Sequence, residues 1–199
     1  MKINNYGFSF PSKLTLSILV VALLSGCAAA VVGTGIAVGA MVATDRRTSG
    51  TQLEDETIEL KSSNAIKNTL GDRAHVNITS YNRRVLLTGE VSSINDKVFI
   101  EKTVSKIENV HSIVNDLAIM PNSEFTRRSE DSIITTKVKA SLLDGSGLQA
   151  SAIKVVTERG VVYLLGKLTS SELDKATQVA RGVSGVVKVV RVAEVIPSN

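Results

Sequence analysis

An internal repeat is the feature that most constrains the fold of this chain. Residues 76–93, VNITSYNRRVLLTGEVSS, align without a gap with residues 153–170, IKVVTERGVVYLLGKLTS. Both segments alternate apolar and polar side chains, which is the period of a half-buried β-strand. Asn82 in one segment and Gly160 in the other are turn-forming residues between two apolar runs. Each segment is therefore predicted to form a β-hairpin.

The sequences that flank the two hairpins also repeat. Before each hairpin, inward-facing positions recur at i, i+4 and i+8, which is the spacing of one helix face. These positions are Ile58, Ser62 and Ile66 in the first copy and Ile134, Val138 and Leu142 in the second. The acidic residues at 54–56 and 130–131 are interpreted as favourable charges at the N-termini of these helices. After each hairpin, a second helical pattern leads to a final strand.

The repeat predicts an α+β fold with two tandem α-β-β-α-β domains. Each domain is small enough to be marginally stable alone, which favours packing of the two against each other. The predicted organisation is a signal peptide at 1–26, a lipidated Gly/Ala-rich tether at 27–52, a first domain at 53–120, a linker at 121–127 and a second domain at 128–197.

Cys27, the single cysteine of the chain, follows a segment typical of secretory signals. The apolar run at 14–24 comes after Lys2 and Lys13 and is too short for a membrane span, which needs ~20 residues. The residues LSGC resemble a bacterial lipobox, which implies cleavage before Cys27 and attachment of palmitate-type acyl chains there. Ala28 stands where an Asp would imply retention in the inner membrane, so the resemblance implies the outer membrane. An ordinary signal peptide with an incidental cysteine is the alternative.

The second copy resembles the BON domain through IITTKVKASLL, IKVVTERGVVYLLGKL and VARGVSGVVKVV. The first copy departs from that pattern, with Ser62 for the usual Val and Asn109 for the usual Gly. With the lipobox and the tether, the pair of copies is similar to the dual-BON-domain outer-membrane lipoproteins. That resemblance implies a lipid anchor, the periplasmic face of the outer membrane, binding of anionic phospholipid and a role in envelope integrity.

One face of the helix at 133–143 is the candidate binding surface. Its aliphatic residues point away from the predicted sheet, with lysines beside them, which is a modest version of an interfacial amphipathic face. The predicted phospholipid-binding residues are Ile133, Lys137, Lys139, Ala140 and Leu143. The first copy has Thr57 and Lys67 at the matching positions and is expected to lack this face. Burial of the two aliphatics against the first domain or a dimer mate, or ordinary isolated exposure, are the alternatives.

Other function classes find little support in the sequence. Basic and acidic residues number 23 and 19, aromatic residues make up 4% and Trp is absent, so no nucleic-acid partner is expected. His75 and His111 have no cysteine or second histidine at ligand spacing, so neither a zinc site nor another cofactor is expected. No catalytic motif appears, so an enzyme is not expected. The alternative function is an interaction module without lipid recognition, whose partners would be envelope or division-site proteins.

Overall fold

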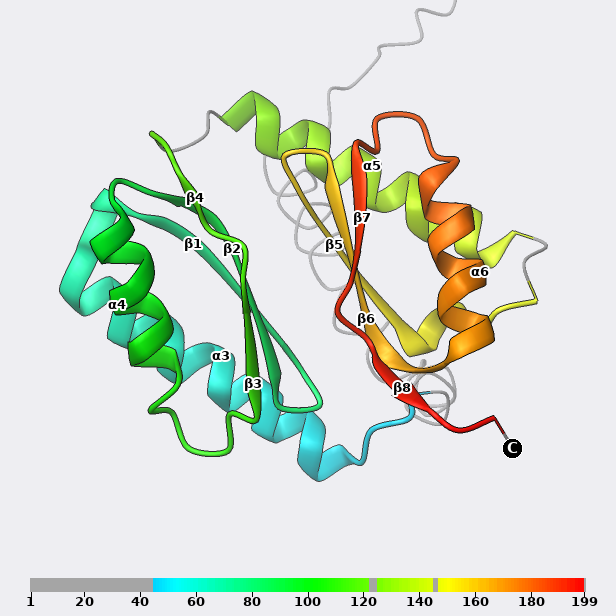
Figure 1. Cartoon of the computed structure of the whole chain (residues 1–199), viewed down its shortest axis with the longest axis horizontal. Coiled ribbons are helices and arrows are strands. Elements are labelled where there is room, and N and C mark those ends of the chain that lie inside the picture. The colour runs from blue at the N-terminus through cyan, green and yellow to red at the C-terminus, as the bar shows by residue number, and fades with distance from the viewer. Residues whose placement is uncertain (1–44, 122–124, 145–146, 199) are drawn as a thin grey trace, which may run out of the picture. The chain divides into compact units, whose positions relative to one another are not determined.

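The computed structural model describes residues 45–121, 125–144 and 147–198, and Thr44–Asn199 forms one compact unit. In each repeat, two helices lie on one face of a mixed sheet (Figure 1), which confirms the α+β class. Cys27, the signal segment and most of the tether lie outside the described residues, so the lipobox interpretation stays a prediction.

The first repeat follows the predicted order of elements. Its elements are α3 (Ser49–Leu70), a 3-10 turn (Gly71–Arg73), β1 (His75–Tyr81), β2 (Arg84–Val91), α4 (Ile94–Val104), β3 (Ser112–Asn115) and β4 (Ala118–Ile119). The second repeat has the same order, with α5 (Phe125–Leu143), a 3-10 turn (Ala150–Ala152), β5 (Ile153–Glu158), β6 (Val161–Thr169), α6 (Ser170–Arg181), β7 (Lys188–Arg191) and β8 (Glu194–Ile196).

The second strand of each hairpin is the centre of its sheet. β2 is antiparallel to β1 and parallel to β3 and β4, and β6 is antiparallel to β5 and parallel to β7 and β8. The final strand, predicted as one continuous segment, is therefore broken in two. Asp116 and Val192 lie at the two breaks, where their N–H groups still donate to Leu87 and Leu164 of the central strands at 2.9 Å.

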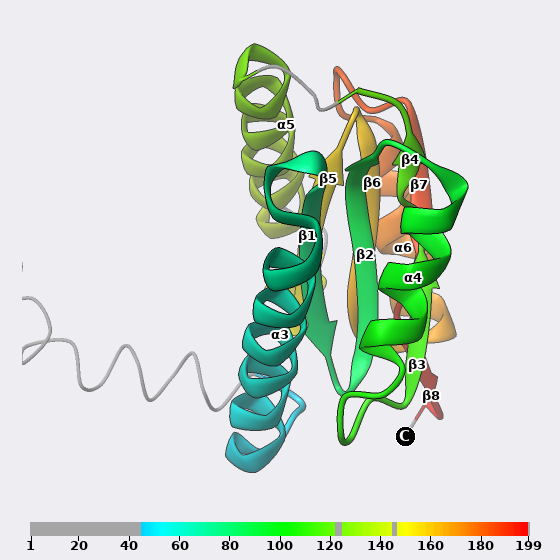
Figure 2. The ribbon, with the colours of Figure 1, turned by 90° about the vertical axis from the view of Figure 1, so that its left-hand side faces the viewer.

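The predicted inward helix positions form the cores between helices and sheet. In Figure 2, α3 and α4 lie side by side over the first sheet. The buried cluster of the first repeat includes Ile58, Ile66, Leu70, Val85, Leu87, Val91, Ile100, Val104 and Leu117. The second repeat buries the equivalent set, which includes Val138, Leu142, Val155, Val162, Leu164, Leu168, Ala176 and Ala180. The helical period read from the sequence thus identified the buried faces correctly.

Both predicted hairpins are present and close through the same turn. Asn82 and Arg83 have φ values of 52° and 64°, and Arg159 and Gly160 have values of 52° and 72°. Two consecutive residues with positive φ mark a type I′ turn, whose twist matches that of the flanking strands.

An aspartate from the preceding helix binds the amides of each turn. Asp55 on α3 accepts hydrogen bonds from the N–H groups of both turn residues at 2.8 Å. Asp131 on α5 accepts the equivalent pair at 2.7 and 2.8 Å. Both aspartates are buried, and hydrogen bonds to an ionised acceptor are stronger than neutral ones. These two contacts join each helix to its hairpin.

This finding corrects the interpretation of the acidic residues. The helix α3 begins at Ser49 with Thr48 as its N-cap, and α5 begins at Phe125, so the acidic residues at 54–56 and 130–131 lie beyond the first turn of either helix. The helices also start earlier than predicted, α3 within the tether at 27–52 and α5 within the linker at 121–127. Apolar periodicity marks only the part of a helix that packs on the sheet, which explains the error.

The faces of the two sheets that carry no helices share one apolar cluster. It comprises Tyr81, Leu86, Tyr163, Leu165 and Val192, with residues from both repeats. Polar groups surround it: the Tyr163 hydroxyl donates to Asp116 at 2.6 Å, and the Asn82 amide donates to Glu194 at 2.6 Å. Burial and the hydrogen bond to Asp116 raise the pKa of Tyr163, so its hydroxyl remains a donor at neutral pH. The predicted packing of the two repeats is confirmed.

Two arginines before α3 add further contacts between the repeats. Arg46 donates to both carboxylate oxygens of Glu172 on α6, at 2.6 and 2.8 Å. Arg47 forms an ion pair with Asp55 at 2.8 Å, and its guanidinium lies 4.0 Å from the centre of the Tyr81 ring. The segment directly before α3 is therefore bound to both copies.

Replacing Asp131 tests the contact between helix and turn. The Asp131→Ala variant leaves two buried turn amides without their charged acceptor, and we expect it to lower the free energy of unfolding by about 2 kcal/mol or more. The neighbouring Glu130 is exposed, so Glu130→Ala serves as the control and should change the free energy of unfolding by less than about 0.5 kcal/mol. Urea denaturation followed by circular dichroism measures both, and equal values would contradict the proposed role of Asp131.

The contact of Arg46 with Glu172 predicts a pH dependence of stability. The hydrogen bonds from Arg46 lower the pKa of Glu172 to about 2. Because the folded pKa lies below that of the unfolded chain, this contribution is complete above about pH 4.5 and is lost as the pH falls toward 2. The Tm difference between the parent and Glu172→Gln should therefore shrink between pH 6 and pH 2. A constant difference would show that the ion pair does not contribute to this pH dependence.

Candidate functional site

The predicted face of α5 is exposed. Ile133 and Leu143 have exposed fractions of 55% and 73%, whereas Val138 and Leu142 are buried beneath the helix. Lys137, Lys139 and Ala140 are exposed as well. Burial of the two aliphatics against the first domain is therefore excluded. Binding of phospholipid by these five residues stays a prediction.

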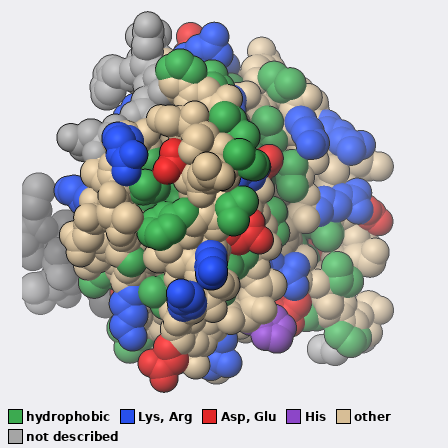
Figure 3. Space-filling view, turned by 60° about the vertical axis from the view of Figure 1, so that its left-hand side comes forward, with side chains coloured by type: hydrophobic (Ala, Val, Ile, Leu, Met, Phe, Trp, Pro, Cys, Tyr) green, Lys and Arg blue, Asp and Glu red, His purple; other side chains and the backbone are tan. Residues whose placement is uncertain are grey.

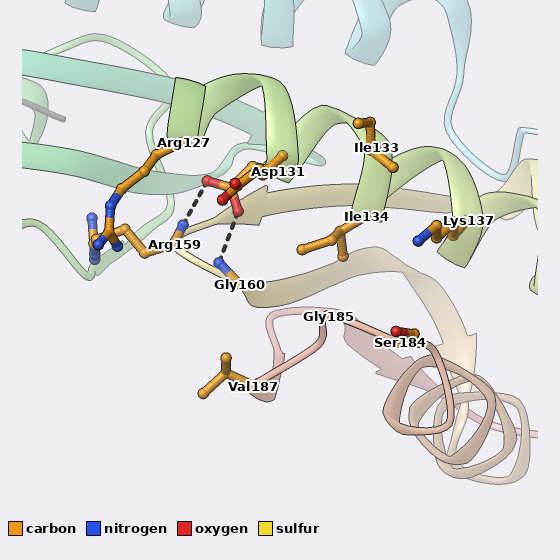
Figure 4. Close-up of a pocket in the computed structure, with 11 residues that line it drawn as sticks. Arg127, Asp131, Ile133, Ile134, Lys137, Arg159, Gly160, Ser184, Gly185 and Val187 are labelled. Atoms are coloured by element: carbon orange, nitrogen blue, oxygen red, sulfur yellow. Dashed lines mark hydrogen bonds between the residues drawn. The ribbon is translucent and has the colours of Figure 1, made fainter. Parts of the chain in front are cut away.

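A pocket of about 390 Å³ opens beside this face (Figure 4). Three segments form its walls: α5, the turn between β5 and β6, and the loop between α6 and β7. Its lining includes Arg127, Ile133, Lys137, Ser184 and Val187. Val187 has an exposed fraction of 79% and faces the pocket from the loop. The structure thus brings two predicted residues, Ile133 and Lys137, together with an exposed aliphatic from another element.

Two glycines allow these segments to approach one another. A Cβ on Gly160 would lie 2.9 Å from Val187, and a Cβ on Gly185 would lie 3.0 Å from Ile134. Both glycines have positive φ, at 72° and 96°, a region that residues with a side chain seldom occupy. Glycine at both positions therefore lets the turn, the loop and α5 lie this close together.

The first repeat carries larger residues at the equivalent places. Arg83 matches Gly160 as the second residue of the turn, and its guanidinium pairs with Glu54 of α3. Asn109 matches Gly185 and also has a positive φ, at 68°. In the second repeat, Glu130 occupies the position of Glu54 and lines the pocket. The two copies thus share a backbone but differ in the side chains at this edge.

The charges of the pocket favour an anion moderately. Arg127, Lys137 and Arg159 contribute positive charge and Glu130 contributes negative charge. Asp131 also lines the pocket, but both of its oxygens accept hydrogen bonds from the turn. On the face seen in Figure 3, Lys and Arg side chains occur at several separate places among hydrophobic and acidic ones. The Lys and Arg side chains on this face therefore do not form one continuous basic patch. They lie in small clusters next to apolar side chains.

Three of the predicted residues lie outside the lining of the pocket. Lys139, Ala140 and Leu143 lie nearer the C-terminus of α5 than Lys137, the last residue of this helix in the lining. Sequence reasoning missed Arg127, which it assigned to the linker at 121–127, and Val187, which lies in the loop between α6 and β7. Gly160 and Gly185 could have indicated these neighbouring walls of the pocket in the sequence, since both are turn residues that precede a strand.

The first repeat also has exposed aliphatics, contrary to the expectation that it lacks an apolar helix face. Leu53 and Leu60 on α3 have exposed fractions of 66% and 63%. They lie seven residues apart and thus on one side of the helix. The matching positions Thr57 and Lys67 are polar and exposed as predicted. The exposed aliphatic residues of the first repeat therefore lie at other positions along the helix than those of the second repeat.

The structure places His75 in a group that the sequence did not reveal. Its Nδ1 atom lies 2.9 Å from Glu90 Oε2, whereas His111 is exposed. Potential metal-binding atoms of His75, Glu90 and Glu158 all lie within 4.8 Å of one another. The expectation that the histidines have no neighbouring ligands considered spacing along the chain, and these three residues come from three different strands.

Comparisons with known proteins agree with the two-domain organisation. The BON domain family model matches residues 54–121 and 130–197. The outer membrane lipoprotein DolP of Haemophilus influenzae is 41% identical over 182 residues, which cover 90% of this chain and 94% of that protein. A 21 kDa hemolysin of Actinobacillus pleuropneumoniae is 37% identical over 74% of this chain and 77% of its own length. Osmotically-inducible protein Y of Escherichia coli is 43% identical over 30% of each chain.

None of the helices in the described part of the chain combines the length and the apolar character that a membrane span requires.

Proposed function

The chain belongs to the BON-domain family, and we propose that it is a lipid-anchored protein of the outer membrane whose second BON domain binds anionic phospholipid. Its role in this proposal is binding at the periplasmic face in support of envelope integrity, and not catalysis.

The proposed anchor rests on the sequence before the described residues. Cys27 follows a lipobox-like LSG and an apolar run, and the relative from Haemophilus influenzae is described as an outer membrane lipoprotein. A single acyl chain holds a protein only reversibly at a membrane, whereas two or three chains anchor it stably. An anchored chain meets the membrane at high local concentration, so a weak binding surface is sufficient for lipid contact.

The observation that carries lipid binding is the shared position of Ile133 and Lys137. Both line the pocket, so an aliphatic side chain and an ammonium group face the same small volume. A phospholipid presents an anionic headgroup beside an apolar region, and this pair is complementary to it. Ile133, Leu143 and Val187 can contact the apolar region, while each nearby lysine contributes ~1 kcal/mol at an anionic surface.

A second candidate function is recruitment of envelope proteins. The first repeat exposes Ile94, Val98 and Phe99 on α4, and Ile119 on β4. Exposed aliphatic and aromatic residues of this kind suit a protein interface. In this alternative, the lipid anchor supplies location and the first repeat supplies the docking surface.

Introduction of a negative charge on α5 tests lipid binding. Because about half of Ile133 is exposed, Ile133→Glu removes roughly 1–1.5 kcal/mol of apolar contact and should weaken binding to vesicles containing phosphatidylglycerol about tenfold. Leu143→Glu should act similarly, and Thr57→Glu in the first repeat is the matched control. The measurement is vesicle co-sedimentation of residues 44–199, with circular dichroism to confirm folding.

The results separate the alternatives. Lys137→Glu should have a smaller effect that fades as the salt concentration rises, since it acts through charge. Equal losses in Ile133→Glu and Thr57→Glu, or no loss in either, would move the lipid contact away from α5. Loss of a dimer in Leu143→Glu would instead favour contact with a second copy.

Lipidation is tested separately in cells. We expect the Cys27→Ala variant to incorporate no labelled palmitate and to be processed poorly, because the acyl chains are attached through the thiol. The parent chain, expressed at the same level, is the control. Incorporation of label into the alanine variant would refute acylation at Cys27, and absence of label from the parent would favour an ordinary signal peptide.

A further inference from the structure

A group of buried ionisable side chains lies between the two repeats. His75 comes from β1 and Glu90 from β2 of the first repeat, and Glu158 comes from β5 of the second. Glu90 and Glu158 have exposed fractions of 0% and 3%, and His75 is partly buried. Two buried carboxylates this close repel each other, so positive charge beside them, such as the guanidinium of Arg159, stabilises the pair.

Neighbouring donors hold the two carboxylates in place. Arg159 Nη1 lies 3.3 Å from Glu90 Oε1 and donates to the Gly89 carbonyl at 3.0 Å. The Asn77 amide donates to Glu158 Oε2 at 2.8 Å. One oxygen of each carboxylate thus has a fixed partner, as is typical of the outer shell around carboxylates that bind a metal.

We propose that His75, Glu90 and Glu158 bind a zinc ion that joins the two BON domains. Zinc binds histidine nitrogen and carboxylate oxygen at about 2.0–2.2 Å, which places tetrahedral ligands roughly 3.3 Å apart. His75 Nδ1 and Glu90 Oε2 are already 2.9 Å apart, and all three ligand atoms lie within 4.8 Å. Small side-chain rotations therefore suffice to surround the ion.

The surroundings of the site fit this metal. A pocket of about 230 Å³, whose lining includes His75, Asn77, Arg128 and Glu158, gives room for a water molecule as the fourth ligand. One imidazole and two carboxylates suit zinc, whereas calcium takes six to eight oxygen ligands and magnesium six. The zinc site does not depend on the lipid contact proposed for α5, because none of its three ligands lines that pocket.

Zinc titration of the full-length protein in detergent, without an affinity tag, tests the site. Isothermal titration calorimetry should give one zinc ion per chain, and cobalt should give the visible absorption of a four-coordinate site. Zinc at a hundredfold excess over its Kd should raise the Tm by roughly 5–10 °C, since it binds only the folded state. His75→Gln and Glu158→Gln should each bind zinc at least tenfold more weakly.

Two further variants make the test specific. Asn77→Ala removes the donor that holds Glu158 and should weaken zinc binding about tenfold without removing a ligand. His111→Gln changes the exposed histidine of the same repeat and should bind zinc like the parent. Circular dichroism without metal confirms that each variant is folded. Equal zinc affinity in the parent, His75→Gln and Asn77→Ala, or no zinc binding by the parent, would overturn the proposal.

Discussion

The hydrogen bonds of a buried aspartate with a hairpin turn determine how each repeat is assembled. Asp55 and Asp131 each accept two amides from a type I′ turn. The contact fixes the helix against the end of the hairpin, and the apolar helix positions then fall over the central strand. Since apolar contacts are not directional, they alone would allow the helix to slide or rotate on the sheet. The directional hydrogen bonds between the aspartate and the turn prevent this sliding and rotation.

The same contact gives both copies the same arrangement of helix and hairpin, and the copies differ in the side chains around it. Asp131 places the second turn beside α5, where Gly160 leaves space for Val187. In the first copy, the equivalent Arg83 fills that side with an ion pair to Glu54. A pocket with aliphatic and basic walls is therefore a property of the second copy's side chains, although the backbone is shared. The second copy therefore has a pocket at an edge that a side chain fills in the first copy.

The contact between the repeats combines an apolar cluster with buried polar groups. Tyr163 and Leu165 contribute apolar area, while Asn77 and Arg159 donate to carboxylates across the interface. A buried charge without a partner is costly, so sliding of one sheet on the other would be unfavourable. The polar groups thus define the register of the two sheets, and the apolar cluster supplies most of the favourable burial.

The sequence by itself determined the repeat, the two hairpins and the buried helix faces. Alternation and helical spacing report directly which side of an element is buried, so Val138 and Leu142 inside and Ile133 and Leu143 outside could be predicted. The same patterns missed the start of α3 at Ser49, because residues before the packed part of the helix show no apolar period.

Only the tertiary structure decided which distant residues meet. Three features each join different elements: the role of Asp131 at the turn, the lining of one pocket by Val187 and Ile133, and the group of His75, Glu90 and Glu158. Periodicity describes one element at a time and carries no information on such contacts. They depend on how helix, turn and sheets pack together, which is why a histidine that looks isolated along the chain lies beside two buried carboxylates in the fold.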